Sequence, residues 1–355
     1  MVAVQLNKGE DDFLKGYSKL GTPEERKEHK REGSLICKDF EELIRKYEEI
    51  LTIAGFARHE KVVSKITSVL MPEQINNFLQ ATINYEKHKN YNSNTGLFIT
   101  KLIQNSHNAG NNNFTLNTKA LSKDIDKIAF DLKGRRGNLL EIIVDGNAGE
   151  WCGFKAKNIG KLHITGNAGG GCSSFAKNIK AIYVGGDAGE YCGSDAKNID
   201  GIYIGGNAGQ GLGCEAKKIK GIYVCGDAGS GCVQKAKSID GIYIAGNAGC
   251  ACAYGAKNIK ELYIGGNVGE ECGSYAKNIK AIYVGGDAGH RCGYGAKNIG
   301  QIFIGGNAGD LCGSNAEHST FKTPNEETLR LLKKNVPWGN KIFFITEDRS
   351  EIQIA

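Results

Sequence analysis

The chain has 355 residues with 45 lysines and arginines against 39 acids, and glycine is the compositional outlier at 50 residues. This length is typical of about two structural units, and a hydrophobic content of 40% is too high for a disordered chain. No run of about 18 apolar residues predicts a membrane span, and the N-terminal residues lack the apolar run of a secretory signal. We therefore expect a cytoplasmic protein, and a net charge of +6 does not by itself indicate nucleic-acid binding.

Residues 1–113 are predicted to form an α-helical domain. Asp39 can cap a first helix, whose apolar face consists of Phe40, Leu43, Ile44, Tyr47, Ile50 and Leu51. A second apolar stripe consists of Val62, Val63, Ile66, Val69 and Leu70. Pro72 can open a third helix, with Ile75, Phe78, Leu79 and Ile83 inward. A fourth helix is expected from Gly96 to Gln104, and the turn-rich segment 105–113 marks a natural boundary.

Residues 141–320 contain nine units of 20 residues each. The motif G-[ND]-A-G recurs once per unit, with its Asn or Asp at 147, 167, 187, 207, 227, 247, 267, 287 and 307, and Val268 replaces the alanine once. We number each unit from 1 at Glu141, Lys161 and so on; the apolar residues then fall at positions 2, 4, 8, 12, 16 and 19. A helical repeat would need a 3.6-residue spacing and few glycines. Alternation around position 3, followed by Gly-rich corners, instead predicts a parallel β-solenoid with one unit per coil.

The expected solenoid is narrow and closed at both ends. Coils that stack at about 4.8 Å would make a rod of roughly 43 Å with ladders of like residues inside. The glycines at positions 6 and 9 are invariant, and we expect them to supply the tight corners and the positive φ values that such corners require. Residues 114–140 are expected to cap the N-terminal end. Residues 321–355, with a helix at 324–335 and a strand at Lys341–Ile345, are expected to cap the other end.

The glycine spacing resembles that of a known repeat. The third unit has Gly186, Gly189 and Gly193 in the pattern G-x-x-G-x-x-x-G, which is complete in six of the nine units. This is similar to the GXXGXXXG repeat of the C-terminal domain of the glutamate synthase large subunit and of the β-helical subunit of formylmethanofuran dehydrogenase. The resemblance implies a right-handed parallel β-helix. It also implies a structural role, holding other domains or subunits without catalytic residues.

Eight cysteines share the inward position 12: Cys152, Cys172, Cys192, Cys232, Cys252, Cys272, Cys292 and Cys312. Stacked coils would bring neighbouring Cα atoms close enough for a disulfide, but a free thiol is also a good small buried side chain. No C-x2-C pair indicates a metal site. We favour a reduced core ladder over disulfides or a metal, which implies a reducing compartment.

A stripe of aromatic residues at position 3 is the candidate interaction site: Tyr183, Tyr203, Tyr223, Tyr243, Tyr263, Tyr283 and Phe303. Their neighbours at positions 1 and 5 are mostly small, so we expect open rings on one face of the rod. Exposed apolar patches often mark binding sites, and Tyr is enriched at interfaces. Two alternatives are cross-coil stacking alone and cover by the N-terminal helices.

Two further ladders are predicted on the surface. Lysines occupy position 17 from Lys157 to Lys297 and could contact a polyanion. However, the array holds 17 basic residues against 16 acids, so we favour a solvated face and consider nucleic acid an unfavoured partner. The Asn or Asp at position 7 is expected to form a hydrogen-bonded ladder at a corner, and calcium binding there is a weak alternative.

No catalytic constellation emerges from the sequence. Departures from the repeat, such as His163, Cys225 and Glu270, are scattered over different coils. We therefore predict no catalytic, cofactor-binding or metal-ligating residue, and expect a non-catalytic scaffold that binds a protein partner, or itself, through the solenoid face or the helical domain. A carbohydrate-active or carbohydrate-binding β-helix is the alternative, because sugars stack on aromatic rings. Polyanion binding through the lysines is a weaker one.

Overall fold

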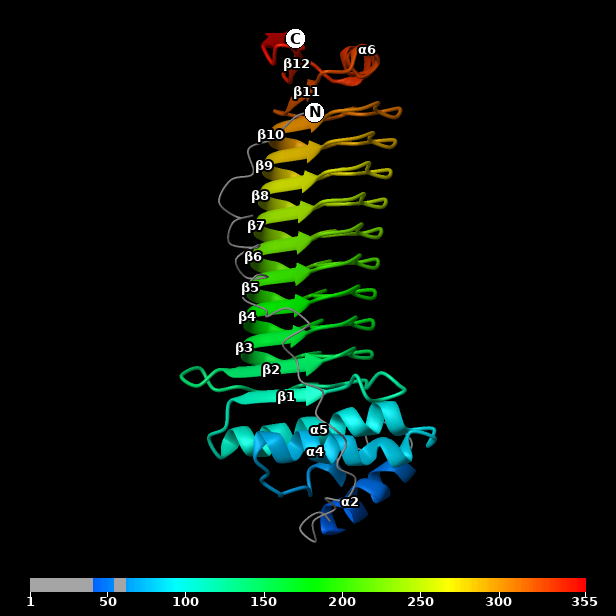
Figure 1. Ribbon diagram of the computed structural model, residues 1–355. Coiled ribbons are helices and arrows are strands. Elements are labelled where there is room, and N and C mark those ends of the chain that lie inside the picture. The colour runs from blue at the N-terminus through cyan, green and yellow to red at the C-terminus, as the bar shows by residue number, and fades with distance from the viewer. Residues whose placement is uncertain (1–40, 54–61) are drawn as a thin grey trace. The chain divides into compact units, whose positions relative to one another are not determined.

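The computed structural model describes residues 41–53 and 62–355, and it confirms a parallel β-solenoid preceded by helices (Figure 1). The helices are α2 (Glu41–Thr52), α4 (Pro72–Ala81), the 3-10 helix η3 (Thr82–Tyr85), α5 (Tyr91–Asn108) and α6 (Glu326–Asn335). The strands are β1 (Asn113–Asn117), β2 (Leu140–Asp145), β3 (Lys157–Ile164), β4 (Lys177–Val184), β5 (Lys197–Ile204), β6 (Lys217–Val224), β7 (Lys237–Ile244), β8 (Lys257–Ile264), β9 (Lys277–Val284), β10 (Lys297–Ile304), β11 (Thr320–Thr323), β12 (Lys341–Ile345) and β13 (Glu351–Gln353).

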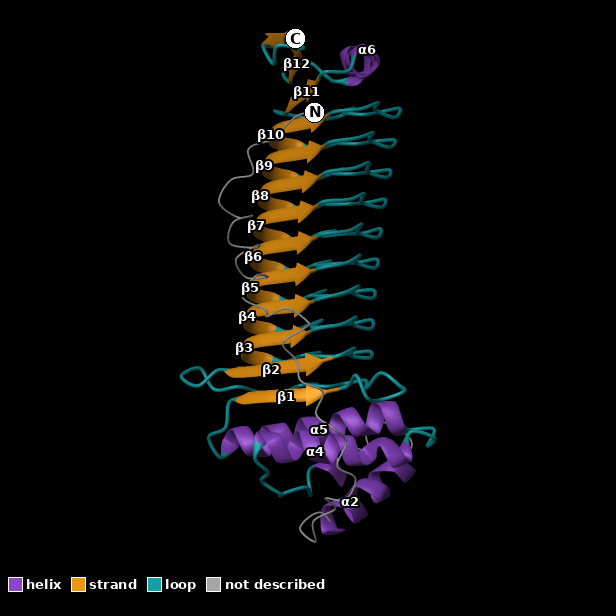
Figure 2. Ribbon diagram, in the orientation of Figure 1, coloured by secondary structure: helices purple, strands orange, loops and turns teal. Residues whose placement is uncertain are grey.

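The described strands form one sheet in chain order, and all neighbours are parallel except the antiparallel pair β12–β13. From β3 to β10 each residue pairs with the residue 20 positions on, for example Tyr203 with Tyr223. The near-side strands in Figure 1 run to the right as the chain rises from β1 toward β10, so the coil is right-handed. Figure 2 shows that each coil leaves its strand through a long turn on one side.

The helical segment differs from the prediction at the second stripe, at Ile83, which is half-buried in η3, and at residues 105–108, which belong to α5 rather than to a boundary turn. Helix α2 buries Leu43, Tyr47, Ile50 and Leu51, α4 begins at Pro72 as expected, and α5 is longer than predicted; Asp39 and Phe40 lie outside the described residues. The stripe from Val62 to Leu70 is not one helical face, because residues 66–71 are irregular and Val69 is 57% exposed. A side chain of α5 stabilises this irregular path, since the Asn105 amide donates to the carbonyls of Ile66 and Ser68 (2.9 and 3.0 Å).

The segment before the repeats is itself a coil of the solenoid. Strand β1 pairs in parallel with β2, and Ile125, Ile128 and Leu132 are buried beneath the first repeat. Its turn residues Lys127, Ala129 and Asp131 have the positive φ values found in the turns of the repeats. The nine 20-residue coils therefore follow one longer coil whose larger core residues face the helices.

The core matches the predicted positions. Residues at positions 2, 4, 8, 12, 16 and 19 are buried in all nine coils, except that Ala308 in the last coil is half-buried. Ile, Leu and Val at positions 2, 4 and 19 fill the wide side of the coil, and Ala and Cys fill the narrow side. Position 13 is also buried, as Ser173, Val233 and Ala253 are each 0% exposed. This inward position was not predicted.

The invariant glycines allow close stacking rather than an unusual conformation. Of the eighteen glycines at positions 6 and 9, only Gly146 has a positive φ, so the expected corner geometry was wrong. A Cβ on Gly166 would lie 2.3 Å from Asn147 Oδ1 of the coil below, and one on Gly229 would lie 2.6 Å from the Gln210 nitrogen. No side chain fits at these positions while the coils keep their spacing.

Positive φ values occur instead at positions 11, 13, 15 and 18 in every one of the nine coils. Most of these residues are not glycine, including Tyr191, Asp195 and Asn198 (φ 59, 55 and 58°). This left-handed conformation costs a non-Gly residue about 1–3 kcal/mol. Hydrogen bonds between turns offset the cost: Tyr191 N donates to Gln210 O of the next coil (2.7 Å), and Gly193 N donates to Cys172 O of the preceding coil (2.8 Å).

Side-chain ladders add to the backbone ladder. The Oδ1 atom at position 7 accepts the N–H of position 7 in the next coil over eight successive steps, at 2.6 to 3.0 Å. This confirms the predicted corner ladder. A second ladder, which was not predicted, joins Asn side chains at position 18, as in Asn198 Nδ2 to Asn178 Oδ1 (2.9 Å).

Helix side chains satisfy the backbone groups of both end coils. At the first coil, Thr100 of α5 donates to Lys127 O (3.1 Å) and accepts from Ala129 N (2.8 Å). At the other end, Thr328 of α6 donates to Gly306 O and accepts from Ala308 N (both 2.9 Å). At each end one threonine thus binds backbone groups of the coil corner that would otherwise pair with a further coil.

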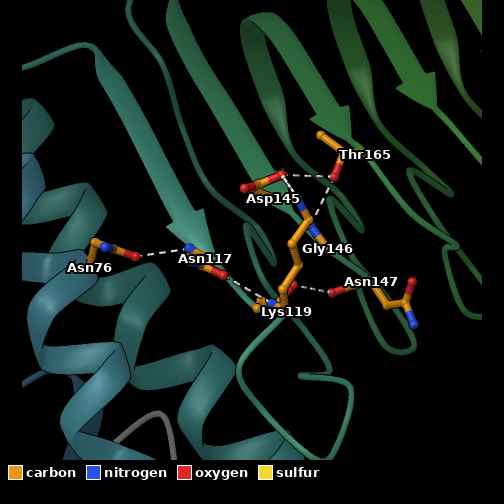
Figure 3. Close-up of polar contacts among 8 residues, drawn as sticks. Asn76, Asn117, Lys119, Asp145, Gly146, Asn147 and Thr165 are labelled. Atoms are coloured by element: carbon orange, nitrogen blue, oxygen red, sulfur yellow. Dashed lines mark hydrogen bonds and ion pairs between the residues drawn. The ribbon is translucent and has the colours of Figure 1, made fainter. Parts of the chain in front are cut away.

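The junction between α4 and the first coils is polar (Figure 3). Asn76 of α4 accepts the N–H of Asn117 at 2.8 Å, and the Lys119 ammonium pairs with Asp145 at 2.7 Å. Thr165 of the second repeat donates to Asp145 at 3.1 Å and accepts from Gly146 N at 2.9 Å. These contacts fix the first corner against the helix that precedes it.

Glycine leaves room for the neighbouring coil at some positions and avoids strain at positive φ at others, and substitutions can separate these two effects. We expect Lys235→Gly to stabilise the protein by about 1 kcal/mol, because Lys235 is exposed with φ 54° and glycine removes the strain. Gly229→Ala should destabilise the protein by about 3 kcal/mol or more, because its Cβ meets the backbone of the preceding coil. Urea unfolding followed by circular dichroism measures both. Gly255→Ala adds a methyl group without a clash at φ +62° and therefore measures the conformational cost alone. If it lowered the free energy of unfolding as much as Gly229→Ala does, this account would be contradicted.

Candidate functional site

The seven predicted interaction residues form one row on the outer face of β4 to β10. Strand register places each directly above the last, from Tyr183 paired with Tyr203 to Tyr283 paired with Phe303. We call this row, with all seven residues, the tyrosine stripe. Every side chain in it is half-buried. The structure therefore brings together residues that lie 20 apart in the sequence.

Four of the tyrosines stack face to face. Ring centroids are 4.7, 5.0 and 5.2 Å apart along Tyr183, Tyr203, Tyr223 and Tyr243, with ring planes within 11° of parallel. The coil spacing imposes this distance, since stacked strands lie about 4.8 Å apart. The Lys161 ammonium lies 5.5 Å from the Tyr183 ring centre and closes the stack through a cation–π contact.

Glycines at position 1 make room for three of the four stacked rings. A Cβ on Gly221 would lie 2.4 Å from Tyr223 Cε2, and Gly201 and Gly241 have the same relation to Tyr203 and Tyr243. These three rings thus lie back over the glycine two residues before them, whereas Tyr183 follows Ala181. The small neighbours were expected to leave the rings open, but within the stack from Tyr183 to Tyr243 the rings cover one another's faces.

Glu261 divides the stripe. It occupies position 1 of the seventh coil, where the preceding three coils have glycine, and Tyr243 Oη donates to its Oε2 at 3.4 Å. Among the described ring pairs, no stacking contact joins Tyr243 to Tyr263. Burial raises the pKa of Tyr243, the Glu261 carboxylate raises it further, and burial also raises the pKa of Tyr183. Both hydroxyls therefore stay protonated at neutral pH, and that of Tyr243 donates to Glu261.

Two aromatic clusters on the turns were not predicted. One contains Phe130, Trp151, Phe154 and Phe175, with neighbouring ring centroids 5.0 to 5.5 Å apart. The other contains Tyr254, Tyr275 and Tyr294, at 5.5 and 5.6 Å. Their residues within the repeats occupy positions 11, 14 and 15, where aromatics occur in only some coils, so no 20-residue period marks them. Tyr275 and Phe175 at position 15 are 46% and 44% exposed.

The cysteines at position 12 form a buried stack of free thiols, each 0 or 1% exposed. No disulfide joins the described cysteines. The adjacent Cys172 thiol and burial raise the pKa of Cys152, and Cys292 and burial do the same for Cys312. Cys225 and Cys250 are exposed, whereas Cys252, at the inward position 12, is buried.

Departures from the repeat do not converge on one place. His290 lies 3.8 Å from Asp310 and Arg291 lies 3.4 Å from Glu271, both as surface pairs. Within residues 41–53 and 62–355, no group of three or more His, Cys, Asp or Glu side chains could hold a metal ion. The arrangement offers rows of identical groups rather than a unique cluster.

Comparisons with known proteins leave the chain without a match: no family model, no curated protein and no solved structure matches it. The resemblance to GXXGXXXG repeats accordingly stays a prediction. In the part of the chain that the structure describes, no helix combines the length and hydropathy that crossing a bilayer requires.

The dependence of the stack on glycine is testable. Gly221→Ala should displace the Tyr223 ring, because the added methyl group meets that ring and not the backbone. We expect a reduced near-ultraviolet circular dichroism signal from tyrosine with the fold retained in the far ultraviolet. Gly137→Ala, which meets no atom within 4 Å, is the control. An unchanged tyrosine signal for Gly221→Ala would show that the rings do not lie as described.

Proposed function

We propose that this protein is a non-catalytic scaffold that binds a protein partner through the tyrosine stripe. The observation that carries the proposal is the order of the rings before any partner binds. Tyr183 to Tyr243 are held by one another and by the coil beneath them. Binding therefore immobilises few further side chains, and the entropic cost of forming an interface is lower.

The residues beside the stripe favour close approach by a partner. Position 5 holds Gly185, Gly205, Gly265, Gly285 and Gly305, with Cys225 and Ala245 between them. No long side chain on this side separates a partner from the ring edges. Tyrosine hydroxyls supply donors along the same row, and Tyr is among the residues that most often dominate interface energies.

The orientation of the rings favours a protein over a carbohydrate. Sugars stack on ring faces, but the faces that the first four rings turn toward one another are occupied within the stack. Ring edges and hydroxyls remain for contact, and these suit side chains and backbone of a protein. Near-identical coils also suit a repeated contact surface better than one active site.

We further propose a reducing compartment such as the cytoplasm. Eight thiols lie one above another in successive or alternate coils of the core. Oxidation of a buried stack would strain the narrow side of the coil, and thiols stay reduced where glutathione and thioredoxin act.

A triple substitution tests the stripe. The partner is first identified by affinity purification from the native cells. Its affinity should fall at least about 100-fold when Tyr203, Tyr223 and Tyr243 are all replaced by serine, since each interface tyrosine contributes on the order of 1 kcal/mol or more. Titration of the purified partner measures the loss. The matched control replaces Tyr191, Tyr254 and Tyr275, which lie on the turns, with serine. Equal binding by the stripe variant and the wild type would contradict the proposal, and glycan binding by the wild type that the stripe variant loses would favour the carbohydrate alternative.

A further inference from the structure

Charge is segregated around the coil, although the array as a whole is nearly neutral. Positions 17 to 20 of the nine units carry thirteen lysines against three acids, whereas positions 5 to 11 carry nine acids and one arginine. Positions 17, 18 and 20 are exposed in most coils. Nucleic acid was disfavoured as a partner because basic and acidic residues nearly balance over the whole array. That sum does not show that one side of the coil is strongly basic.

The centre of this side is a row of nine lysines in register. We call it the lysine row: Lys133, Lys157, Lys177, Lys197, Lys217, Lys237, Lys257, Lys277 and Lys297. Lys133 joins it from the irregular first coil, and Glu317 ends it. Eight steps of about 4.8 Å give the row a length of roughly 38 Å.

The lysine row lacks counter-charges along most of its length. Its end members pair with acids, Lys133 with Asp131 at 3.3 Å and Lys297 with Glu317 at 2.7 Å. The seven lysines between them make no ion pair with any described residue. Two acids at position 20 are used elsewhere, since Asp200 pairs with Lys220 and Asp240 with Lys260, both at 2.9 Å. Asp195 and Glu215 lie two residues before Lys197 and Lys217, and they are the acids at position 15 beside the row. Like charges on directly opposed strand residues repel, so the fold itself gains nothing from this arrangement.

We propose that the lysine row binds single-stranded nucleic acid. Its phosphates supply the missing counter-charges, and an extended strand can follow a straight row of cations. A duplex fits less well, because its phosphates wind around the helix axis and would meet the row only at intervals.

Exposed aromatic residues beside the row favour a strand that carries bases. Phe175 and Tyr275 lie two residues before Lys177 and Lys277, and the intervening Ala176 and Ala276 are buried, so ring and lysine both point outward. Proteins that bind single strands combine a basic track with aromatic rings on which bases stack. A chain of phosphates without bases would make no use of these rings.

This surface is separate from the tyrosine stripe. The lysine row lies at the start of each long strand and the stripe near its end, with the left-handed residue at position 18 and the buried residue at position 19 between them. The two proposals can therefore fail independently.

Fluorescence anisotropy with a labelled oligouridylate of about 12 nucleotides tests the proposal on the full-length chain. Contact with seven lysines predicts that log K falls with log salt concentration with a slope of about −5. Replacing Lys197, Lys217 and Lys237 with Gln should weaken binding at least tenfold and reduce the slope by about 2. The matched control replaces Lys65, Lys87 and Lys89, which are exposed in the helical segment, with Gln and should leave both values unchanged.

A second pair of measurements separates nucleic acid from other polyanions. Phe175→Ala with Tyr275→Ala should weaken binding of the oligouridylate several-fold while leaving that of inorganic polyphosphate unchanged. Absence of binding at low salt, equal losses for the two lysine triples, or tighter binding of a duplex of the same length would each overturn the proposal. Binding of polyphosphate and oligouridylate alike, with no effect of the aromatic substitutions, would also overturn it in favour of a general polyanion surface.

Discussion

The fold depends on how closely the backbones of successive coils approach. At positions 6 and 9 the distance leaves no room for a Cβ: one on Gly186 would lie 2.0 Å from Asn167 Oδ1. This approach allows the Asn or Asp at position 7 to accept the N–H of the next coil. It also allows the turn residues to bond both upward and downward, which holds many non-Gly residues in the left-handed region.

Strict register converts a 20-residue repeat into rows of one residue type. Inside the coil it makes the thiol stack and the aliphatic ladders, and outside it makes the tyrosine stripe and the lysine row. Inside the coil, rows of identical apolar residues are not unfavourable, because like side chains pack well against one another. A row of like charges is unfavourable outside unless something neutralises it. The same register leaves open backbone groups at both ends, and Thr100 and Thr328 bind them in equivalent ways.

The sequence was informative where a residue type repeats and uninformative where only the conformation repeats. Alternation and period identified six inward positions, the stripe and the closing helix and strand. The left-handed positions were missed because residues as different as Tyr191, Glu271 and Leu311 occupy the same φ region at position 11. The first coil was missed as a coil because it lacks the G-[ND]-A-G motif, although Lys127, Ala129 and Asp131 repeat the turn conformation. Tyr203, Tyr223 and Tyr243 each lie over a glycine two residues earlier, a relation that the period alone does not show.

The most direct test of the central claim is deletion in register. Removing residues 201–240 takes out two whole coils and joins Asp200 to Gly241, which preserves every coil-to-coil contact type. We expect cooperative thermal unfolding to persist and the maximum dimension in small-angle X-ray scattering to shrink by about 10 Å. Removing residues 201–239 shifts all later coils by one position, and should abolish cooperative unfolding. Similar unfolding of the two deletion variants would contradict the claim that backbone register between coils determines the fold.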